Sequence, residues 1–333
     1  MAILKKNFKK EISLEKKKPS KIEVKGSRKA IVWLILISFL LSALFYLKTQ
    51  KIDLYFLKPQ PFIYKIGQKK QEEKLSQSLG IKVNLSNPTG LENSLNFLLK
   101  DLQGEYGFYY FNFNTKEELG INENQVFQAA SVNKLPIMIS FYQEVEKGNL
   151  KIDSLYVLDK EDFQDYGSGV LHTQEQGIRY SYEELVKLMG KHSDNTAAYV
   201  MARIVGYKKI RDYLDKYEMN NTTLDDNNTT TPKEMGNYLR LFYENELIGV
   251  ENKEKILEFL TQTDFEDRLP QGVPSYIRVA HKTGNLAGVY NDCGFILSSK
   301  PYLVCVFSQD TLEQQALDVI PKIAEILWEY NKT

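Results

Sequence analysis

The chain has 333 residues, with 43 basic and 43 acidic side chains, so its formal net charge is zero. Its basic excess lies in the first 29 residues, which hold eleven Lys or Arg and three Glu, and we expect no nucleic-acid partner. The three histidines, His172, His192 and His281, show no metal-ligand spacing with cysteines or carboxylates. We therefore expect neither a metal nor a cofactor.

The first predicted element is an uncharged run over residues 30–47, AIVWLILISFLLSALFYL. Eighteen residues of helix span about 27 Å, near the hydrocarbon thickness of a bilayer. A buried core helix is the alternative, although core helices are seldom apolar all round. The run is longer than a signal-peptide core, and no small-x-small cleavage site follows it. We expect an uncleaved single-pass anchor in the cell membrane, with the basic N-terminus cytoplasmic and the remainder extracytoplasmic.

The expected organisation is a basic cytoplasmic tail over 1–29, the transmembrane anchor over 30–47, a stalk over 48–90 and a globular domain over 91–333. The domain begins with leucines at helical spacing over 91–102, followed by an aromatic strand over 107–113 and a turn over 114–120 into a second strand. Helix signals then dominate. A first helix over 134–147 is expected to end at Gly148, and a second begins at a capping box formed by Ser181 and Glu184. A third is capped by Asp194 or Asn195 and stops at Gly206, and a fourth begins at Thr-Pro over 231–232.

Strand signals return over 276–282, 292–297 and 302–308, and a last helix over 311–330 is expected to bend at Pro321. Strands therefore lie at both ends of the domain and helices in its middle. This order predicts an α/β fold, in which an antiparallel sheet carries the N- and C-terminal helices on one face and an all-helical lobe forms separately.

Three short motifs carry the chemistry: SVNK at 131–134, SDN at 193–195 and KTG at 282–284. Ser131 precedes an apolar helix, where backbone N–H groups favour a developing negative charge, and Lys134 lies one turn on, where an amine of lowered pKa can activate a serine. Pro136 conflicts with a helix that begins at Ser131, because it removes a backbone donor from the second turn. Taken alone, each motif is as readily a helix cap or a surface turn.

The other two motifs supply the remaining parts of an acyl-transfer site. Ser193 can pass a proton to the leaving nitrogen, and Asn195 can hold the substrate amide. On an edge strand, Lys282 and Thr283 can bind a substrate carboxylate, while Gly284 lets the substrate backbone come close.

In this order the motifs resemble those of the penicillin-recognising serine enzymes, the class A β-lactamases and penicillin-binding proteins, over the whole of 91–333. NTTTP at 228–232 resembles the DTTTP that closes the Ω-loop of class A enzymes, and YGSGV at 166–170 resembles a loop beside their site. The resemblance implies the β-lactamase/transpeptidase-like α/β fold. It also implies an oxyanion hole built from the backbone N–H groups of Ser131 and Asn285, donors that typically contribute ~10²–10³ in rate each.

One departure from the class A pattern bears on deacylation, the step that completes turnover. Class A enzymes carry a Glu-x-x-Leu-Asn segment whose glutamate activates the deacylating water, whereas this chain reads MNNTTLDDNNTTTP from Met219. Glu218 lies too early, Asn228 replaces the usual aspartate, and Asp225 or Asp226 is an alternative base. Since losing a general base typically costs ~10²–10⁴ in rate, we expect acylation of Ser131 and slow deacylation.

The predicted substrate is a β-lactam or a cell-wall peptide ending in D-alanine, because both join an acyl carbon, a neighbouring amide and a terminal carboxylate. The alternatives are a penicillin-binding D,D-peptidase-like enzyme and a non-catalytic module that senses β-lactams or peptidoglycan. An esterase is less favoured, because there is no Gly-x-Ser-x-Gly elbow. The oligomeric state stays open.

Cys293 and Cys305 flank an expected hairpin turn at 298–301, which places them nearly opposite each other on neighbouring strands. A disulfide is conceivable there, but its geometry is demanding. We expect two buried free thiols, with the disulfide as the alternative.

Overall fold

The structure is a computed structural model that describes Ile37 and residues 61–332. The expected tail over 1–29, the anchor over 30–47 and the first part of the stalk lie outside the described residues, apart from Ile37. Within the described part of the chain, no helix combines the length and apolarity needed to cross a bilayer. The compact unit of interest spans Phe62–Thr333.

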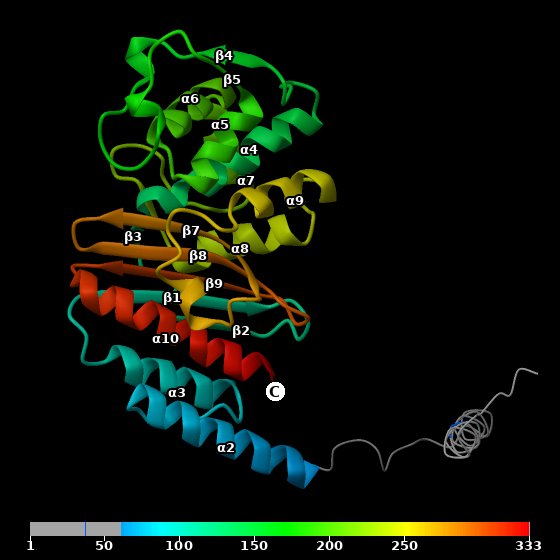
Figure 1. The fold of residues 1–333 in the computed structure, drawn as a ribbon, viewed down its shortest axis with the longest axis vertical. Coiled ribbons are helices and arrows are strands. Elements are labelled where there is room, and N and C mark those ends of the chain that lie inside the picture. Colours follow the sequence, from blue (N-terminus) through cyan, green and yellow to red (C-terminus); the bar gives the residue numbers. More distant parts are fainter. Residues whose placement is uncertain (1–36, 38–60, 333) are drawn as a thin grey trace, which may run out of the picture. The chain divides into compact units, whose positions relative to one another are not determined.

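A five-stranded antiparallel sheet forms the centre of this unit, in the order β2-β1-β9-β8-β7 (Figure 1). Its strands come from both ends of the domain, as the sequence predicts: β1 (Glu105–Asn112), β2 (Glu118–Ile121), β7 (Arg278–Leu286), β8 (Val289–Leu297) and β9 (Tyr302–Gln309). One row of the register reads Tyr109, Cys305, Cys293 and Lys282 from β1 to β7. That row ends at the KTG motif on the edge strand.

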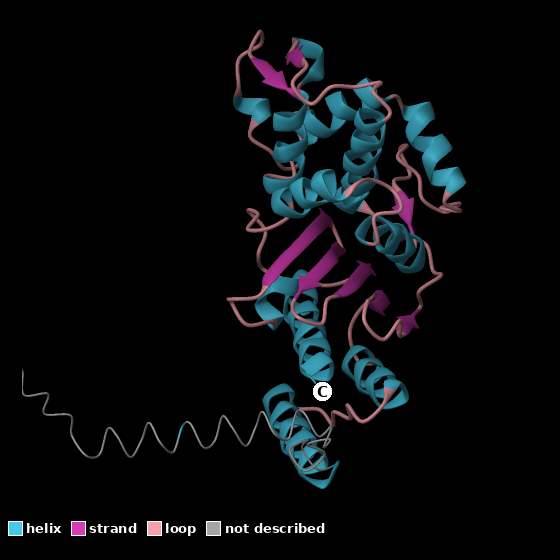
Figure 2. Ribbon diagram, turned by 90° about the vertical axis from the view of Figure 1, so that its right-hand side faces the viewer, coloured by secondary structure: helices cyan, strands magenta, loops and turns pink. Residues whose placement is uncertain are grey.

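Helices cover one face of the sheet and belong to the two ends of the domain (Figures 1 and 2). They are α3 (Pro88–Leu99) and α10 (Glu313–Lys332), with α2 (Pro61–Leu79) next to α3. Apolar side chains of α3 and α10 form a buried cluster with alternate residues of β1 and β9 and with Ile296 of β8. The predicted placement of the first and last helices on one face is therefore confirmed. Pro321 lies inside α10, which is assigned as one helix.

The N-terminal boundary of the folded unit differs from the expected one. Residues placed in the stalk by their mixed composition contribute Leu75, Val83 and Leu85 to this same cluster, and all three are at most 5% exposed. The turn after α2 is fixed by side chains, because Val83 N donates to Ser76 Oγ at 2.9 Å and Leu85 N to Glu72 Oε1 at 2.7 Å. The mixed composition of residues 48–90 predicts a stalk, and it does not reveal that these three residues pack on the domain.

The second face of the sheet carries α8 (Pro232–Tyr243), and beyond it lies the all-helical lobe, with a second buried cluster (Figure 1). The lobe contains α4 (Lys134–Glu146), α5 (Tyr182–Lys191), α6 (Asn195–Val205), α7 (Tyr207–Lys216) and α9 (Val250–Phe259). Two short ladders complete the assignment: β3 (Phe127–Gln128) with β6 (Thr229–Thr230), and β4 (Leu155–Val157) with β5 (Arg179–Ser181). The expected α/β architecture with a helical lobe is confirmed.

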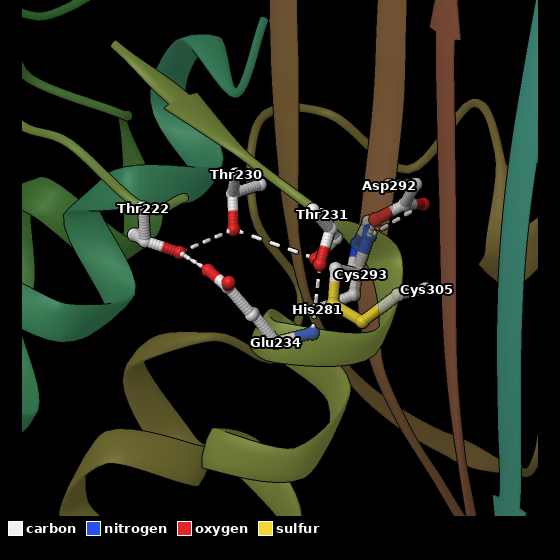
Figure 3. Close-up of a disulfide and its surroundings, with 8 residues drawn as sticks. All are labelled: Thr222, Thr230, Thr231, Glu234, His281, Asp292, Cys293 and Cys305. Atoms are coloured by element: carbon white, nitrogen blue, oxygen red, sulfur yellow. Dashed lines mark hydrogen bonds and ion pairs between the residues drawn. A yellow bond between two sulfur atoms is a disulfide. The ribbon is translucent and has the colours of Figure 1, made fainter. Parts of the chain in front are cut away.

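The cysteine expectation is wrong. Cys293 on β8 and Cys305 on β9 are register partners, as their distances from the turn predict, but the structure joins them in a disulfide (Figure 3). Both are buried beneath the helical lobe in the row that ends at Lys282. Sequence spacing fixes such a register but carries no information on whether two opposed thiols are oxidised.

Candidate active site

Ser131 lies in a short 3₁₀ helix, η2 (Ala130–Asn133), which leads directly into α4. Ala130 has a φ of 48°, an unusual conformation for a residue with a side chain. Because α4 begins at Lys134, Pro136 falls in its first turn, where backbone N–H groups have no intrahelical partner. The conflict expected at Pro136 therefore does not arise.

The SDN motif forms the junction between α5 and α6. Ser193 has a φ of 51°, and Asp194 caps α6 by accepting from Ala197 N at 2.8 Å. The second oxygen of the same carboxylate accepts from Val170 N and Leu171 N at 2.6 and 2.8 Å. Asp194 thus orders both the helix start and the loop over 166–170.

That loop is fitted closely to the motif through its glycines and its backbone. Asn195 Nδ2 donates to Tyr166 O at 2.8 Å, and Asn195 N donates to Ser168 O at 3.0 Å. A Cβ on Gly169 would lie 2.4 Å from Asp194 Oδ2, so only glycine fits this approach. The predicted position of the loop beside the site is therefore confirmed.

The KTG motif lies inside β7 and not at its end, since the ladder with β8 continues from Lys282 to Leu286. β7 is an edge strand of the sheet, as expected. A Cβ on Gly284 would lie 2.6 Å from Ala129 O and 3.2 Å from Ser131 N. Gly284 therefore lets the edge strand approach the backbone of Ser131.

A chain of hydrogen bonds joins the three motifs. Lys134 Nζ lies 2.9 Å from Ser131 Oγ, 3.1 Å from Ser193 Oγ and 2.7 Å from Asn195 Oδ1. It also donates to Ser193 O at 2.6 Å. Lys282 Nζ reaches the same Ser193 Oγ from the other side, at 2.9 Å, and donates to Thr283 O at 2.9 Å. Two amines thus contact one hydroxyl.

Both amines are buried, which disfavours their charged forms. Burial, reinforced by the Lys282 charge and opposed by Asp194, holds the pKa of Lys134 well below its ordinary value. Burial also lowers the pKa of Lys282 to about 7, against the attraction of Asp292 and together with the repulsion of Arg268. A neutral Lys134 beside Ser131 has the free electron pair that a general base requires.

Lys282 does not reach the surface of the site. Its side chain is 1% exposed, and Thr283 is the member of the motif that lines the cleft beside Ser131. The Lys282 charge therefore acts from beneath, through Ser193 and Thr283. Asn285 is exposed and lines the same cleft, and Gly284 separates it from Thr283 along β7.

The loop over 219–230 is tied to η2 by two asparagines. Asn133 Nδ2 donates to Thr223 O at 2.7 Å and to Asn228 Oδ1 at 2.8 Å, and Asn228 Nδ2 donates to Ala130 O at 3.1 Å. Sequence reasoning missed Asn133, because nothing in the motif separates it from a spacer between serine and lysine. The sequence shows that Asn228 replaces the usual aspartate, but it does not show that Asn228 is bonded to Asn133.

The site opens into a cleft of about 1170 Å³. Its walls come from η2, α4, α6, α7, β7 and the two loops over 164–168 and 223–228. Among the described residues lining it, the only carboxylates are those of Asp225 and Asp226, and both are exposed. Asp225 Oδ1 accepts from Asn227 N at 2.9 Å within its own loop. No glutamate lines the cleft in the described part of the chain.

Comparison with known proteins agrees with this geometry. Residues 90–331 match the model of the β-lactamase enzyme family. The β-lactamase VEB-1 of Pseudomonas aeruginosa is 25% identical over 269 residues, covering 70% of this chain and 87% of that protein. A β-lactamase crystal structure from Sphaerobacter thermophilus is 26% identical with a TM-score of 0.69, covering 74% of this chain and 98% of that one.

A further solved structure, PBP-A, shares the fold at 22% identity with a TM-score of 0.69, covering 72% of this chain and 95% of that one. A mutant of PBP-A was solved as an acyl-enzyme complex with penicillin G. Because the family match spans the described domain from α3 to α10 and takes in all three motifs, this chain belongs to the β-lactamase enzyme family and is a class A β-lactamase-like serine hydrolase.

Proposed function

We propose that the protein is a membrane-anchored serine acyl-transfer enzyme that forms an acyl-enzyme on Ser131 with β-lactams or D-alanyl cell-wall peptides and releases it slowly. The observation that carries the proposal is the hydrogen-bonded chain Ser131–Lys134–Ser193–Lys282, which joins nucleophile, base and proton carrier within 3.1 Å at each step. No bond in this chain needs a metal or a cofactor.

The proton path follows from this chain. Neutral Lys134 takes the Ser131 hydroxyl proton as Oγ attacks the substrate carbonyl. When the carbon–nitrogen bond breaks, Lys134 returns a proton through Ser193 Oγ to the leaving nitrogen. The proposed donors to the oxyanion are the backbone N–H groups of Ser131 and Asn285.

Substrate recognition is assigned to the residues of β7 and α6 that line the cleft. Thr283, with the Lys282 charge beneath it, suits a carboxylate, and Asn195 suits the amide on the acyl side of the substrate. The names of two similar proteins, VEB-1 and the enzyme from Sphaerobacter thermophilus, support a β-lactam, and the PBP-A complex supports an acyl-enzyme.

Slow release is proposed because a deacylating base is missing from the described walls of the cleft. Asp225 and Asp226 are its only carboxylates there, and Asp225 is used by its own loop. The same feature favours a D,D-peptidase-like enzyme over an efficient β-lactamase.

The location is proposed from residues 1–47 alone. An 18-residue apolar run after eleven basic residues favours a single-pass anchor with the domain outside the cytoplasm. The test is carbonate extraction of membranes from cells that express the full chain. Release of the protein by carbonate would remove the anchor from the proposal.

The test of function is intact-mass analysis of the full chain in detergent during incubation with benzylpenicillin. We expect an adduct of one penicillin mass that persists for hours and that Ser131→Ala abolishes. An adduct that decays within seconds would mean an efficient β-lactamase and would overturn slow release. If an adduct persists while D-alanyl peptides are not turned over, the protein would be a β-lactam sensor.

A further inference from the structure

We propose that His192 and Asp264 are positioning residues for acylation, because their hydrogen bond fixes the turn that presents Ser193 Oγ to the two amines of the site. This inference rests on the proposed function, in which Ser193 passes a proton to the leaving nitrogen. Neither His192 nor Asp264 lines the cleft, so neither is placed to touch a substrate. Their effect on the reaction therefore has to pass through Ser193.

The backbone of Ser193 needs support from both sides. Its φ of 51° lies in the left-handed region, which a residue with a side chain keeps only where its surroundings hold it there. On the C-terminal side, Asp194 caps α6 and Asn195 N donates to Ser168 O. On the N-terminal side α5 ends, so the support there has to come from another part of the chain.

The loop over 261–268, which follows α9, supplies that support. Asp264 N donates to Lys191 O at 3.0 Å. His192 Nδ1 lies 2.8 Å from Asp264 Oδ2, and because a carboxylate accepts, the imidazole N–H is the donor. Lys191 Nζ also donates to Thr261 O. The end of α5 is thus bonded to this loop through both backbone and side chains.

The other end of the same loop is anchored on β7, so the loop links two of the three motifs. Glu266 Oε1 accepts from Thr263 N at 2.7 Å and lies 3.2 Å from His281 Nε2. Between the two anchors, Phe265 lines the cleft, and the centroid of its ring lies 5.8 Å from Lys282 Nζ. A displacement of the loop would therefore be felt on both sides of the proposed proton path.

The proton path tolerates little displacement. Ser193 Oγ lies 3.1 Å from Lys134 Nζ and 2.9 Å from Lys282 Nζ, so a shift of the turn lengthens at least one of these contacts. A misplacement of about 1 Å can cost ~10² in rate. The side chains of His192 and Asp264 are 34% and 57% exposed, so removing their bond opens no cavity in the core. The bond is expected to contribute position and little stability.

The experiment uses the full chain in detergent and separates k2, the rate constant of acylation, from K, the dissociation constant of the preceding complex. It compares benzylpenicillin with a thiolester that carries the acyl amide and terminal carboxylate of an acyl-D-alanyl peptide. The leaving nitrogen of penicillin needs the proton that Ser193 delivers, whereas a thiolate leaves without one. Penicillin acylation is followed by intact mass, and thiolester acylation by the thiol released in the first turnover.

We expect His192→Leu to lower k2 for benzylpenicillin by about 10–10² while K changes by less than about threefold. The thiolester should keep its k2 within about twofold, because its leaving group does not depend on Ser193. A side chain that only stabilises the fold would lower k2 for both substrates alike, so the difference between the substrates reports on the position of the proton carrier.

Conservative variants and a matched control locate the effect in the hydrogen bond. His192→Asn keeps an N–H donor near the position of Nδ1 and should restore most of k2, and Asp264→Asn keeps the acceptor and should do the same. Asp264→Leu should reproduce the loss. His172→Leu is the control, because His172 is exposed and does not line the cleft, and it should acylate like the wild type.

A double-mutant cycle tests whether the effect passes through Ser193. In a Ser193→Ala background, His192→Leu should lower k2 for benzylpenicillin no further, because the hydroxyl that it positions is gone.

The outcomes separate the two proposals. An unchanged k2 in His192→Leu, an equal loss with penicillin and thiolester, or an equal loss with and without Ser193 would overturn the positioning role and leave the proposed function intact. Absence of any adduct between the wild type and benzylpenicillin would overturn the proposed function, and this inference with it.

Discussion

Ser193 Oγ lies between the two amines of the site, and this arrangement links their charges. Lys134 Nζ and Lys282 Nζ are 3.1 and 2.9 Å from that oxygen, so protonation of one disfavours protonation of the other. Burial lowers the pKa of both amines, and one carboxylate opposes burial at each of them, Asp194 at Lys134 and Asp292 at Lys282. In the proposed mechanism Lys134 acts as the neutral base and Lys282 as the cation.

This assignment predicts the pH dependence of acylation. Lys282 has a pKa of about 7 in the free enzyme, so its charge is lost as the pH rises through that value. For penicillins with a free carboxylate, the acylation rate constant k2/K should fall as the pH rises above 7. The steepest expected fall is about tenfold per pH unit. The methyl ester of the same penicillin should lack this alkaline fall, and equal profiles for acid and ester would remove Lys282 from carboxylate recognition.

His281 precedes Lys282 on β7 and forms a buried ion cluster that the mechanism does not use. Its Nδ1 lies 2.8 Å from Asp292 Oδ1, and its Nε2 lies 3.2 Å from Glu266 Oε1. Burial lowers the pKa of this imidazole, but Asp292 and Glu266 outweigh burial and raise the pKa to about 9. Asp292 also accepts from Leu269 N, which ties the cluster to η5 (Leu269–Gly272).

The cluster predicts a pH-dependent contribution to stability. A folded pKa of about 9 against an unfolded value of 6.5 means that the folded state binds more protons between these values. The contribution, about 3 kcal/mol, is complete below pH 6.5 and is lost as the pH rises through 9. Urea unfolding of the wild type and His281→Asn should therefore differ most at pH 6 and least at pH 9.5. A difference independent of pH would mean that His281 is neutral in the folded protein.

The edge strand β7 and the 3₁₀ helix η2 meet at Gly284, and this contact sets the distance between the strand and Ser131. A methyl group at this position would lie 2.6 Å from Ala129 O, which is backbone and cannot rotate away. The strand must therefore shift if a side chain is added. A shift of about 1 Å between catalytic parts can cost ~10² in rate.

We accordingly expect Gly284→Ala to lower k2/K by about 10² while the protein stays folded, because only an edge strand has to move. The measurement is stopped-flow acylation with a fluorescent penicillin, together with a thermal unfolding curve. Gly249→Ala serves as the control, since the nearest atom to its added methyl group is a flexible Glu146 carboxylate oxygen at 3.2 Å. Wild-type acylation by Gly284→Ala would show that η2 can give way without disturbing Ser131.

The layered fold and the three motifs could be read from the sequence because both depend on local patterns. Aromatic strands, capping residues and motif order are visible along the chain, and hydrogen bonds of at most 3.1 Å join Ser131, Lys134, Ser193 and Lys282 from the three motifs. Pairings between distant segments could not be read. Asn133 with Asn228, His281 with Glu266 and the oxidised state of Cys293 depend on tertiary contacts that leave no periodic signal.

The packing of α2 and the residues after it on the domain is the feature that composition reveals least. It determines where the folded domain begins. Leu75, Val83 and Leu85 are buried in the cluster under α3 and α10, on the face of the sheet opposite α8 (Figure 1). A chain that starts at residue 91 lacks all three, whereas one that starts at residue 62 keeps them.

The loss of a single buried leucine side chain costs on the order of 2–5 kcal/mol of unfolding free energy, and the shorter chain loses all three of these residues. The chain over 91–333 should therefore melt several degrees below the chain over 62–333, while the two acylate with benzylpenicillin at the same rate. The full chain with Leu75→Ala and Val83→Ala is the internal check, because it should lose stability in the same direction with residues 62–90 still present. Equal melting temperatures for the two truncated chains would mean that residues 62–90 serve only to connect the domain to what precedes it. A slower acylation by the shorter chain would mean that the two faces of the sheet are mechanically coupled through β8 and β9.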